Sequence, residues 1–159
     1  MLYHISKLHR DEQELVKKAP LLVSVLVASS DGDVDAREID KVVKLIHTRS
    51  FSDTSDIRHL YREIDHDVEA SLNVILKGLL TDMAEREKRL SEELSGLNRI
   101  IEKLEPTIAK DYYNSLRNFA LRVAQTSGGI FGMGQVNYHK KDIVKLPMLK
   151  VPQGGSGKS

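Results

Sequence analysis

The sequence predicts an all-α protein that forms a single compact bundle of about six to eight helices. Apolar residues recur every three or four positions along most of its 159 residues, which is the period of helices that bury one face. No segment alternates polar and apolar residues between hairpin-type turns, as a half-buried strand would. We expect this domain to span residues 1–150 and the Gly- and Ser-rich residues 151–159 to form a flexible tail.

The first half of the chain contains three predicted helices. The first runs from Asp11 towards Ser29, and Pro20 divides it or begins a second segment, because proline lacks the backbone N–H that a helix interior needs. Asp31-Gly32 ends this pattern. The second helix opens with a capping box at positions 35 and 38. The buried stripes of the second and third helices consist of Ile39, Val42, Val43 and Ile46, and of Ile57, Leu60, Tyr61 and Ile64.

The second half predicts helices over residues 68–80, through residues 90–104, from Pro106 to Gly128-Gly129, and from residue 137 to just before Pro147. Leucine and isoleucine recur at alternating spacings of four and three between residues 90 and 104. This seam lasts only about two heptads, so we interpret it as a helix packed within the domain and not as a coiled coil. The buried stripe of the helix that Pro106 begins consists of Ile108, Tyr112, Leu116, Phe119 and Val123.

Composition excludes several classes of function. The 24 Lys and Arg residues against 23 Asp and Glu give a net charge of only +1, whereas proteins that grip nucleic-acid phosphates carry a clear basic excess. The longest apolar run, residues 21–28, is far shorter than the ~20 residues of a membrane helix, so we expect no insertion into a membrane, with peripheral association left open. The absence of cysteine excludes disulfides and thiolate zinc sites. The start of the chain resembles no signal peptide, and we expect a cytoplasmic protein.

The most informative segment is the helix–turn–helix corner at residues 31–38, hereafter the acidic corner. Its four carboxylates belong to Asp31, Asp33, Asp35 and Glu38. Carboxylate oxygens suit Ca²⁺ or Mg²⁺, and repulsion among them favours the uptake of a cation. The segment is no EF-hand, because Ala36 and Val42 stand where that loop needs Gly and Glu. Helix capping by Asp35 and Glu38 explains the same residues, so a divalent-cation site and a pair of caps are both open interpretations.

The acidic corner resembles the first repeat of the TerB-like domains, which are named for tellurite-resistance proteins. The shared pattern is Ala-x-x-Asp-Gly-x-Val-x-x-x-Glu, which runs here from Ala28 to Glu38. TerB-like domains are all-helical and consist of two similar halves, each with an Asp-Gly turn followed by Glu. The family is thought to bind divalent metal through the acids of both turns, within membrane-associated stress-response assemblies.

The second half of the chain repeats this pattern in altered form, over a resemblance that spans residues 12–146. Gly134 and Val136 lie 102 residues after Gly32 and Val34, and the same offset aligns Lys140 with Glu38. The acid expected before the second glycine is Met133. The resemblance therefore implies two pseudo-repeated halves, with metal ligands in the first turn alone. Alternatively, Lys140 reaches across to the acidic corner and neutralises it with no ion present.

Histidines suggest a different metal site. His59, Glu63 and His66 lie on one face of a predicted helix, and Glu63 and His66 have the Glu-x-x-His spacing of di-iron carboxylate bundles. Such a bundle needs a second copy of this motif, which the sequence lacks. We therefore interpret the three residues as an exposed polar face.

These observations predict a non-enzymatic TerB-like module that acts through protein partners in a tellurite or metal stress response and binds Ca²⁺ or Mg²⁺ at the acidic corner. No Gly-x-Ser-x-Gly elbow appears, and no other histidine has neighbours that form a catalytic pattern. Two alternatives are a ferritin-like carboxylate and histidine metalloenzyme and a purely structural interaction domain.

Overall fold

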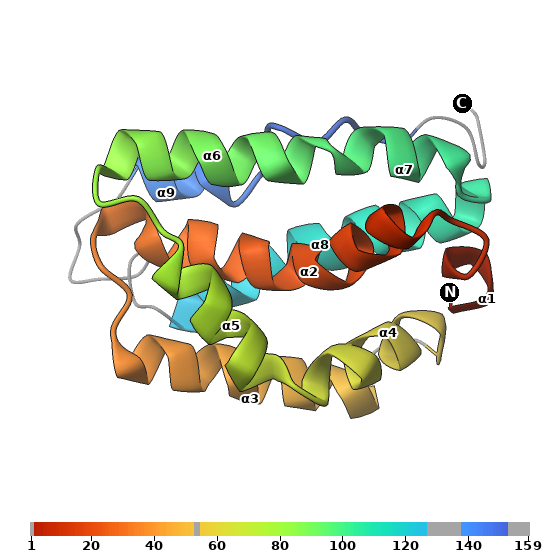
Figure 1. The fold of residues 1–159 in the computed structure, drawn as a ribbon, viewed down its shortest axis with the longest axis horizontal. Helices are drawn as coiled ribbons and strands as arrows, with labels where there is room; N and C mark the ends of the chain where they lie inside the picture. Colours follow the sequence, from red (N-terminus) through yellow and green to blue (C-terminus); the bar gives the residue numbers. More distant parts are fainter. Residues whose placement is uncertain (1, 53–54, 127–137, 153–159) are drawn as a thin grey trace.

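The computed structural model describes residues 2–52, 55–126 and 138–152. Their secondary structure is helical, with no strand in these ranges, which confirms the predicted fold class (Figure 1). None of the described helices is both long and apolar enough to span a lipid bilayer. The elements in chain order are α1 (Leu2–Ile5), α2 (Arg10–Ala28), the 3₁₀ turn η1 (Ser29–Asp31), α3 (Ala36–Ser52), α4 (Ser55–Asp65), α5 (Val68–Lys77), α6 (Met83–Ser95), α7 (Leu97–Lys103), α8 (Pro106–Thr126) and α9 (Tyr138–Ile143).

Helix α2 forms the centre of the bundle. Every residue from Ala19 to Ser29 is buried, so this half of the helix is covered on all sides. A helix that is apolar all round must be enclosed by other elements. Helices α4, α5, α6, α7 and α8 supply that cover, and α8 makes the most extensive contact (Figure 1). The remaining helices are therefore positioned by the surface of α2 that each one covers.

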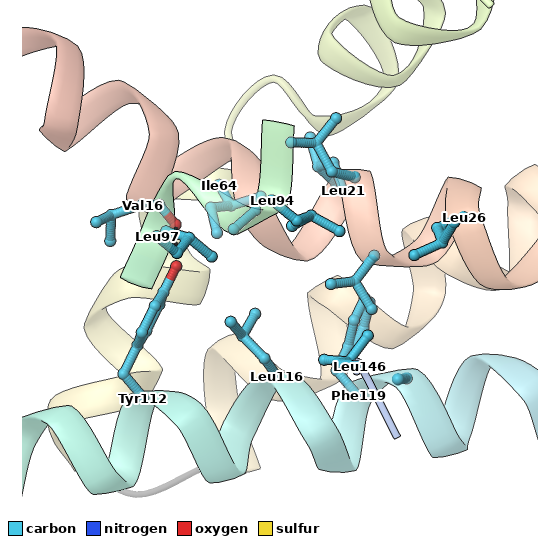
Figure 2. Packing of buried hydrophobic residues seen from close by; sticks show 14 of the residues in the cluster. Val16, Leu21, Leu26, Ile64, Leu94, Leu97, Tyr112, Leu116, Phe119 and Leu146 are labelled. Carbon is cyan, nitrogen blue, oxygen red and sulfur yellow. Dashed lines mark hydrogen bonds between the residues drawn. The ribbon is translucent and has the colours of Figure 1, made fainter. Parts of the chain in front are cut away.

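Contrary to expectation, α2 continues through Pro20 as a single helix. Proline cannot donate the N–H that would otherwise reach the carbonyl of Val16, four residues earlier. In the structure, the hydroxyl of Tyr112 on α8 donates a hydrogen bond of 2.9 Å to that carbonyl oxygen (Figure 2). The partner helix thus supplies the donor that proline removes. Periodicity within α2 could not reveal this contact, because the donor lies 96 residues further along the chain.

Helices α2 and α8 run parallel. Figure 2 shows Val16 beside Tyr112 at one end of the contact and Leu26 near Phe119 towards the other. Both helices therefore end at the same end of the bundle, where α9 packs against η1 and α2. Lys41 of α3 donates a 2.8 Å hydrogen bond to the carbonyl of Thr126 at the end of α8. A cation at this position also interacts favourably with the negative end of the helix dipole.

The predicted seam at residues 90–104 is buried within the domain, as expected, but two helices carry it. Helix α6 ends at Ser95 and α7 begins at Leu97, with Gly96 between them. A side chain at Gly96 would approach Leu15 of α2 to within 3.2 Å, so glycine permits the close passage of the two segments. Helix α8 begins at Pro106, as predicted, and α5 ends three residues before the expected position 80.

The segment after α9 is fastened across α7. Asn98 donates from its side-chain amide to the carbonyl of Met148 and accepts from the backbone N–H of Lys150, both at 2.9 Å. Leu146, between α9 and these two points, is fully buried and adopts a φ of 50°, which leucine rarely does. These contacts hold α9 at the end of the bundle. The expected turn at Gly128-Gly129 and the second Gly-x-Val-x turn lie outside the described residues, as does the tail from residue 153 onwards.

The Tyr112–Val16 hydrogen bond yields a double-variant prediction. Tyr112→Phe should lower the free energy of unfolding by about 1–3 kcal/mol, because the buried carbonyl of Val16 loses its donor. Pro20→Ala restores a helical N–H for the same carbonyl, so the second substitution should recover most of that loss. Urea denaturation of the wild type, both single variants and the double variant measures the coupling. Strictly additive effects would show that proline and tyrosine are unrelated.

Burial of Tyr112 leads to a second prediction, that the stability of the fold depends on pH in the alkaline range. Burial, and secondarily the nearby Tyr61, raises the pKa of the Tyr112 hydroxyl well above its ordinary value of 10.0. The unfolded chain therefore releases this proton first, and the free energy of unfolding should fall as pH rises above about 10, by at most ~1.4 kcal/mol per pH unit. Tyr112→Phe should remove this part of the slope in denaturation measured from pH 9 to 11. Tyr3→Phe, at an exposed tyrosine, is the control and should leave the slope unchanged.

Candidate functional site

The acidic corner connects α2 to α3 at the end of the bundle where α9 lies. Gly32 adopts φ 151° and ψ −156°, a conformation that essentially only glycine can take, and this turns the chain away from α2. Asp35 then accepts a 2.8 Å hydrogen bond from the backbone N–H of Glu38. The capping interpretation is therefore confirmed for Asp35, whose carboxylate satisfies one of the unpaired donors in the first turn of α3.

A buried arginine of α6 is hydrogen-bonded to the acidic corner. The sequence did not indicate this residue. Arg86 is 5% exposed, and its Nη2 donates to the carbonyls of Ser29 and Gly32, each at 3.2 Å. Its Nη1 lies 3.7 Å from a carboxylate oxygen of Asp33, whose side chain is fully exposed. Arg86 thus ties the end of α2 to the turn after it. No signal in the sequence identifies Arg86, because it is one of several charged residues in the first half of α6.

The structure gives the predicted metal ligands different surroundings. Asp33 and Asp35 are exposed and contact Arg86 and the start of α3, respectively. Glu38 is half-buried, and its Oε2 atom has no contact with solvent. The side chain of Asp31 lies outside the described part of the structure. Across the described ranges, no three His, Asp or Glu side chains converge in a way that could hold a metal ion.

Lys140 lies beside this corner. It is fully buried, with 0% of its surface exposed, and it belongs to α9, which packs against η1. Its neighbour His139 contacts Glu87 of α6 through Nε2, so α9 is attached to α6 as well. The expectation that Lys140 stands near the acidic corner agrees with the contact between α9 and η1.

The residues of the predicted histidine face are exposed, as expected, but α4 ends at Asp65, so His66 follows the helix and does not share its face. His59 and His66 are exposed, and Glu63 forms a 2.9 Å ion pair with Lys17 of α2. The structure therefore uses Glu63 to join α4 to α2. It brings neither histidine into a cluster of metal ligands within the described residues.

A second feature, the α5 groove, lies between α2, α4, α5 and α6. It consists of two hollows of about 330 and 180 Å³ that share Lys18, Val74 and Ile75. Its floor is apolar, and Val74 on its wall is 71% exposed. The ion pairs Lys17–Glu63 and Lys18–Glu93, at 2.9 and 2.7 Å, lie along its rim. The floor and wall are formed by Leu21, Leu22, Ile64, Val74, Ile75, Leu79 and Leu80.

The fold defines the chain as an all-α helical bundle, and the comparisons with known proteins add one relative. A protein of Methanothermobacter thermautotrophicus described as "Uncharacterized protein ORF11'" is 27% identical over 121 residues, which cover 73% of this chain and 74% of that protein. No known family matches the sequence, and no solved structure matches it significantly.

The contacts of Arg86 predict a large effect of its removal. Arg86→Met keeps most of the apolar stem but leaves the carbonyls of the buried Ser29 and the half-buried Gly32 without a charged donor, and it should lower the free energy of unfolding by about 2–4 kcal/mol. Arg89→Met, three residues along the same helix at an exposed position, should change it by less than about 0.5 kcal/mol. Urea denaturation measures both. Equal effects of the two substitutions would contradict the anchoring role of Arg86.

Proposed function

We propose that this protein is a non-enzymatic TerB-like helical module that acts through a protein partner in a response to tellurite or metal stress. The observation that carries the proposal is the α5 groove, a pair of adjoining hollows with an apolar floor, a charged rim and the exposed Val74 on its wall. The resemblance of the acidic corner to TerB-like domains supports the assignment to a stress response.

The chemistry of the α5 groove favours one kind of partner, an amphipathic helix. Val74 exposes most of its surface to solvent although it adjoins the buried Ile75 and Leu21. A helix with a narrow apolar stripe would cover this surface, as in other helix-in-groove complexes. The rim carries both signs of charge, with Glu14 and Asp67 near one hollow and Arg89 near the other. A partner helix with basic residues at one end of its stripe and acidic residues at the other would match them.

Site-specific cross-linking tests this proposal. A photoreactive benzoylphenylalanine at Val74 should form a cross-link in cells to a segment that is amphipathic and helical. The matched control is the same group at Phe51, which is 64% exposed on α3 and lies outside the groove. A synthetic peptide of the cross-linked segment should bind the purified protein, and Val74→Asp should weaken binding at least about tenfold, since it places a charge against apolar surface.

Phe51→Asp should leave the affinity for the peptide unchanged. Identical cross-links from Val74 and Phe51, or a peptide whose affinity does not respond to Val74→Asp, would overturn the α5 groove as the partner site. Circular dichroism of each variant confirms that the bundle is intact before binding is compared.

A further inference from the structure

We propose that the α5 groove binds its partner helix in one direction, parallel to α5, with the first turn of the partner at Asp67 and its last turn at Arg89. This inference rests on the proposed function, because it concerns the helix that the groove would hold. It adds which end of the partner carries basic residues, which end carries acidic residues, and in what order its apolar side chains occur.

The α5 groove follows the length of α5 and has two distinct ends. Asp67 and Ser71, at the start of α5, line only the larger hollow, of about 330 Å³. Gly78 and Leu79, just after α5 ends, line only the smaller hollow, of about 180 Å³. Val74 lies between these two pairs in the sequence and lines both hollows. A helix that fills both hollows therefore lies along α5, and the two ends of the groove decide which direction it takes.

Opposite charges predominate at the two ends of the groove. The side chains that line only the larger hollow include three acids and one base, and those that line only the smaller hollow include two bases and one acid. The first set consists of Glu14, Glu63, Asp67 and Lys17, and the second of Arg86, Arg89 and Glu93. The positive end of a partner is therefore attracted to the larger hollow and its negative end to the smaller one.

Asp67 and Arg89 are the rim charges most available to a partner. Both lysines that line the groove are paired with acids of α4 and α6, at 2.9 and 2.7 Å. Glu14 lies 3.6 Å from Arg10, and Arg86 is hydrogen-bonded to the acidic corner. Asp67 occupies the N-cap of α5, but its exposed side chain accepts no capping hydrogen bond there. Arg89 is exposed as well, so a partner that contacts these two side chains leaves the ion pairs of the rim intact.

The backbone of a partner helix favours the same direction. Unpaired N–H groups give the first turn of a helix a partial positive charge, and unpaired carbonyls give the last turn a partial negative charge. In the parallel direction Asp67 lies beside the first turn and Arg89 beside the last, whereas the opposite direction places each charge against the end that it repels. Basic side chains in the first turn and acidic ones in the last turn are unfavourable in an isolated helix, and here the groove offsets that cost.

The unequal hollows determine the order of the partner's apolar side chains. In the parallel direction the N-terminal half of the partner meets the larger hollow, which accommodates a bulky side chain such as Phe or Leu. Its C-terminal half meets the smaller hollow, which suits Val or Ala. Ser71 and Gly78, one at each hollow, lie roughly 10 Å apart along a helical path at about 1.5 Å per residue, so these two apolar residues are spaced about two turns apart.

Cross-links from the two ends of the groove test the direction. Benzoylphenylalanine is placed at Ser71, in the larger hollow, or at Leu79, in the smaller one, and after cross-linking in cells mass spectrometry locates each attachment site in the partner. The site reached from Ser71 should precede the site reached from Leu79 by about seven residues within one helix. The same group at Phe51, outside the groove, should not label this helix.

Reversal of the rim charges tests their part in the direction. The peptide of the cross-linked segment, and the same peptide with its basic and acidic turns exchanged, are titrated against the wild type and against Asp67→Lys combined with Arg89→Glu. The wild type should prefer the first peptide and the double variant the second, and the two affinity ratios should differ at least about tenfold. Each peptide is compared with itself across the two proteins, so the difference in helicity between the free peptides cancels.

The matched control is Glu69→Lys combined with Lys88→Glu, at exposed positions of α5 and α6 outside both hollows, and it should leave the preference unchanged. Cross-links in the reverse order would overturn the proposed direction, as would equal peptide preferences of the wild type and of Asp67→Lys combined with Arg89→Glu. In either case a peptide whose affinity still responds to Val74→Asp leaves the groove as the partner site. Identical cross-links from Val74 and Phe51 would contradict the proposed function itself, and the direction with it.

Discussion

The hydrogen bond from Tyr112 to the carbonyl of Val16 is the contact on which the arrangement of the bundle depends. Pro20 would be expected to interrupt α2, yet α2 must continue because its second half is buried on every side and supplies the surface that the other helices cover. The interruption affects one carbonyl, and a tyrosine on α8 satisfies it. The central helix is therefore stabilised as one element by its parallel partner.

The parallel pairing of α2 and α8 determines which segments of the chain meet at one end of the bundle. Two helices that run in the same direction end at the same end of the molecule, and there α9 contacts η1, about a hundred positions earlier in the chain. The acidic corner lies at this end with α9, and buried cations approach it from α6 and α9. The α5 groove lies instead between α2, α4, α5 and α6, where Val74 of α5 leaves most of its apolar surface exposed.

Local patterns predicted the helices, and contacts between helices escaped prediction. The stripes that contain Ile46, Tyr61 and Phe119 follow a helical period, and all three residues are buried as expected. The helix cap at Asp35 could also be predicted from the sequence, because its donor and acceptor lie three residues apart. By contrast, Arg86 and Tyr112 act on carbonyls 57 and 96 residues away. A backbone carbonyl has no residue-specific signature, so one sequence gives no indication of which side chain will reach it.

The carboxylates of the acidic corner can be neutralised in two ways, by a bound divalent ion or by a positively charged side chain of the protein. A corner neutralised by a divalent ion gains stability with ion concentration, because the ion binds only the folded form. A corner neutralised by a side chain of the protein has a stability that does not depend on ion concentration, since its cation is covalently part of the chain. Because Arg86 donates to the carbonyls of Ser29 and Gly32 and lies 3.7 Å from Asp33, a positive charge of the protein itself is part of this corner.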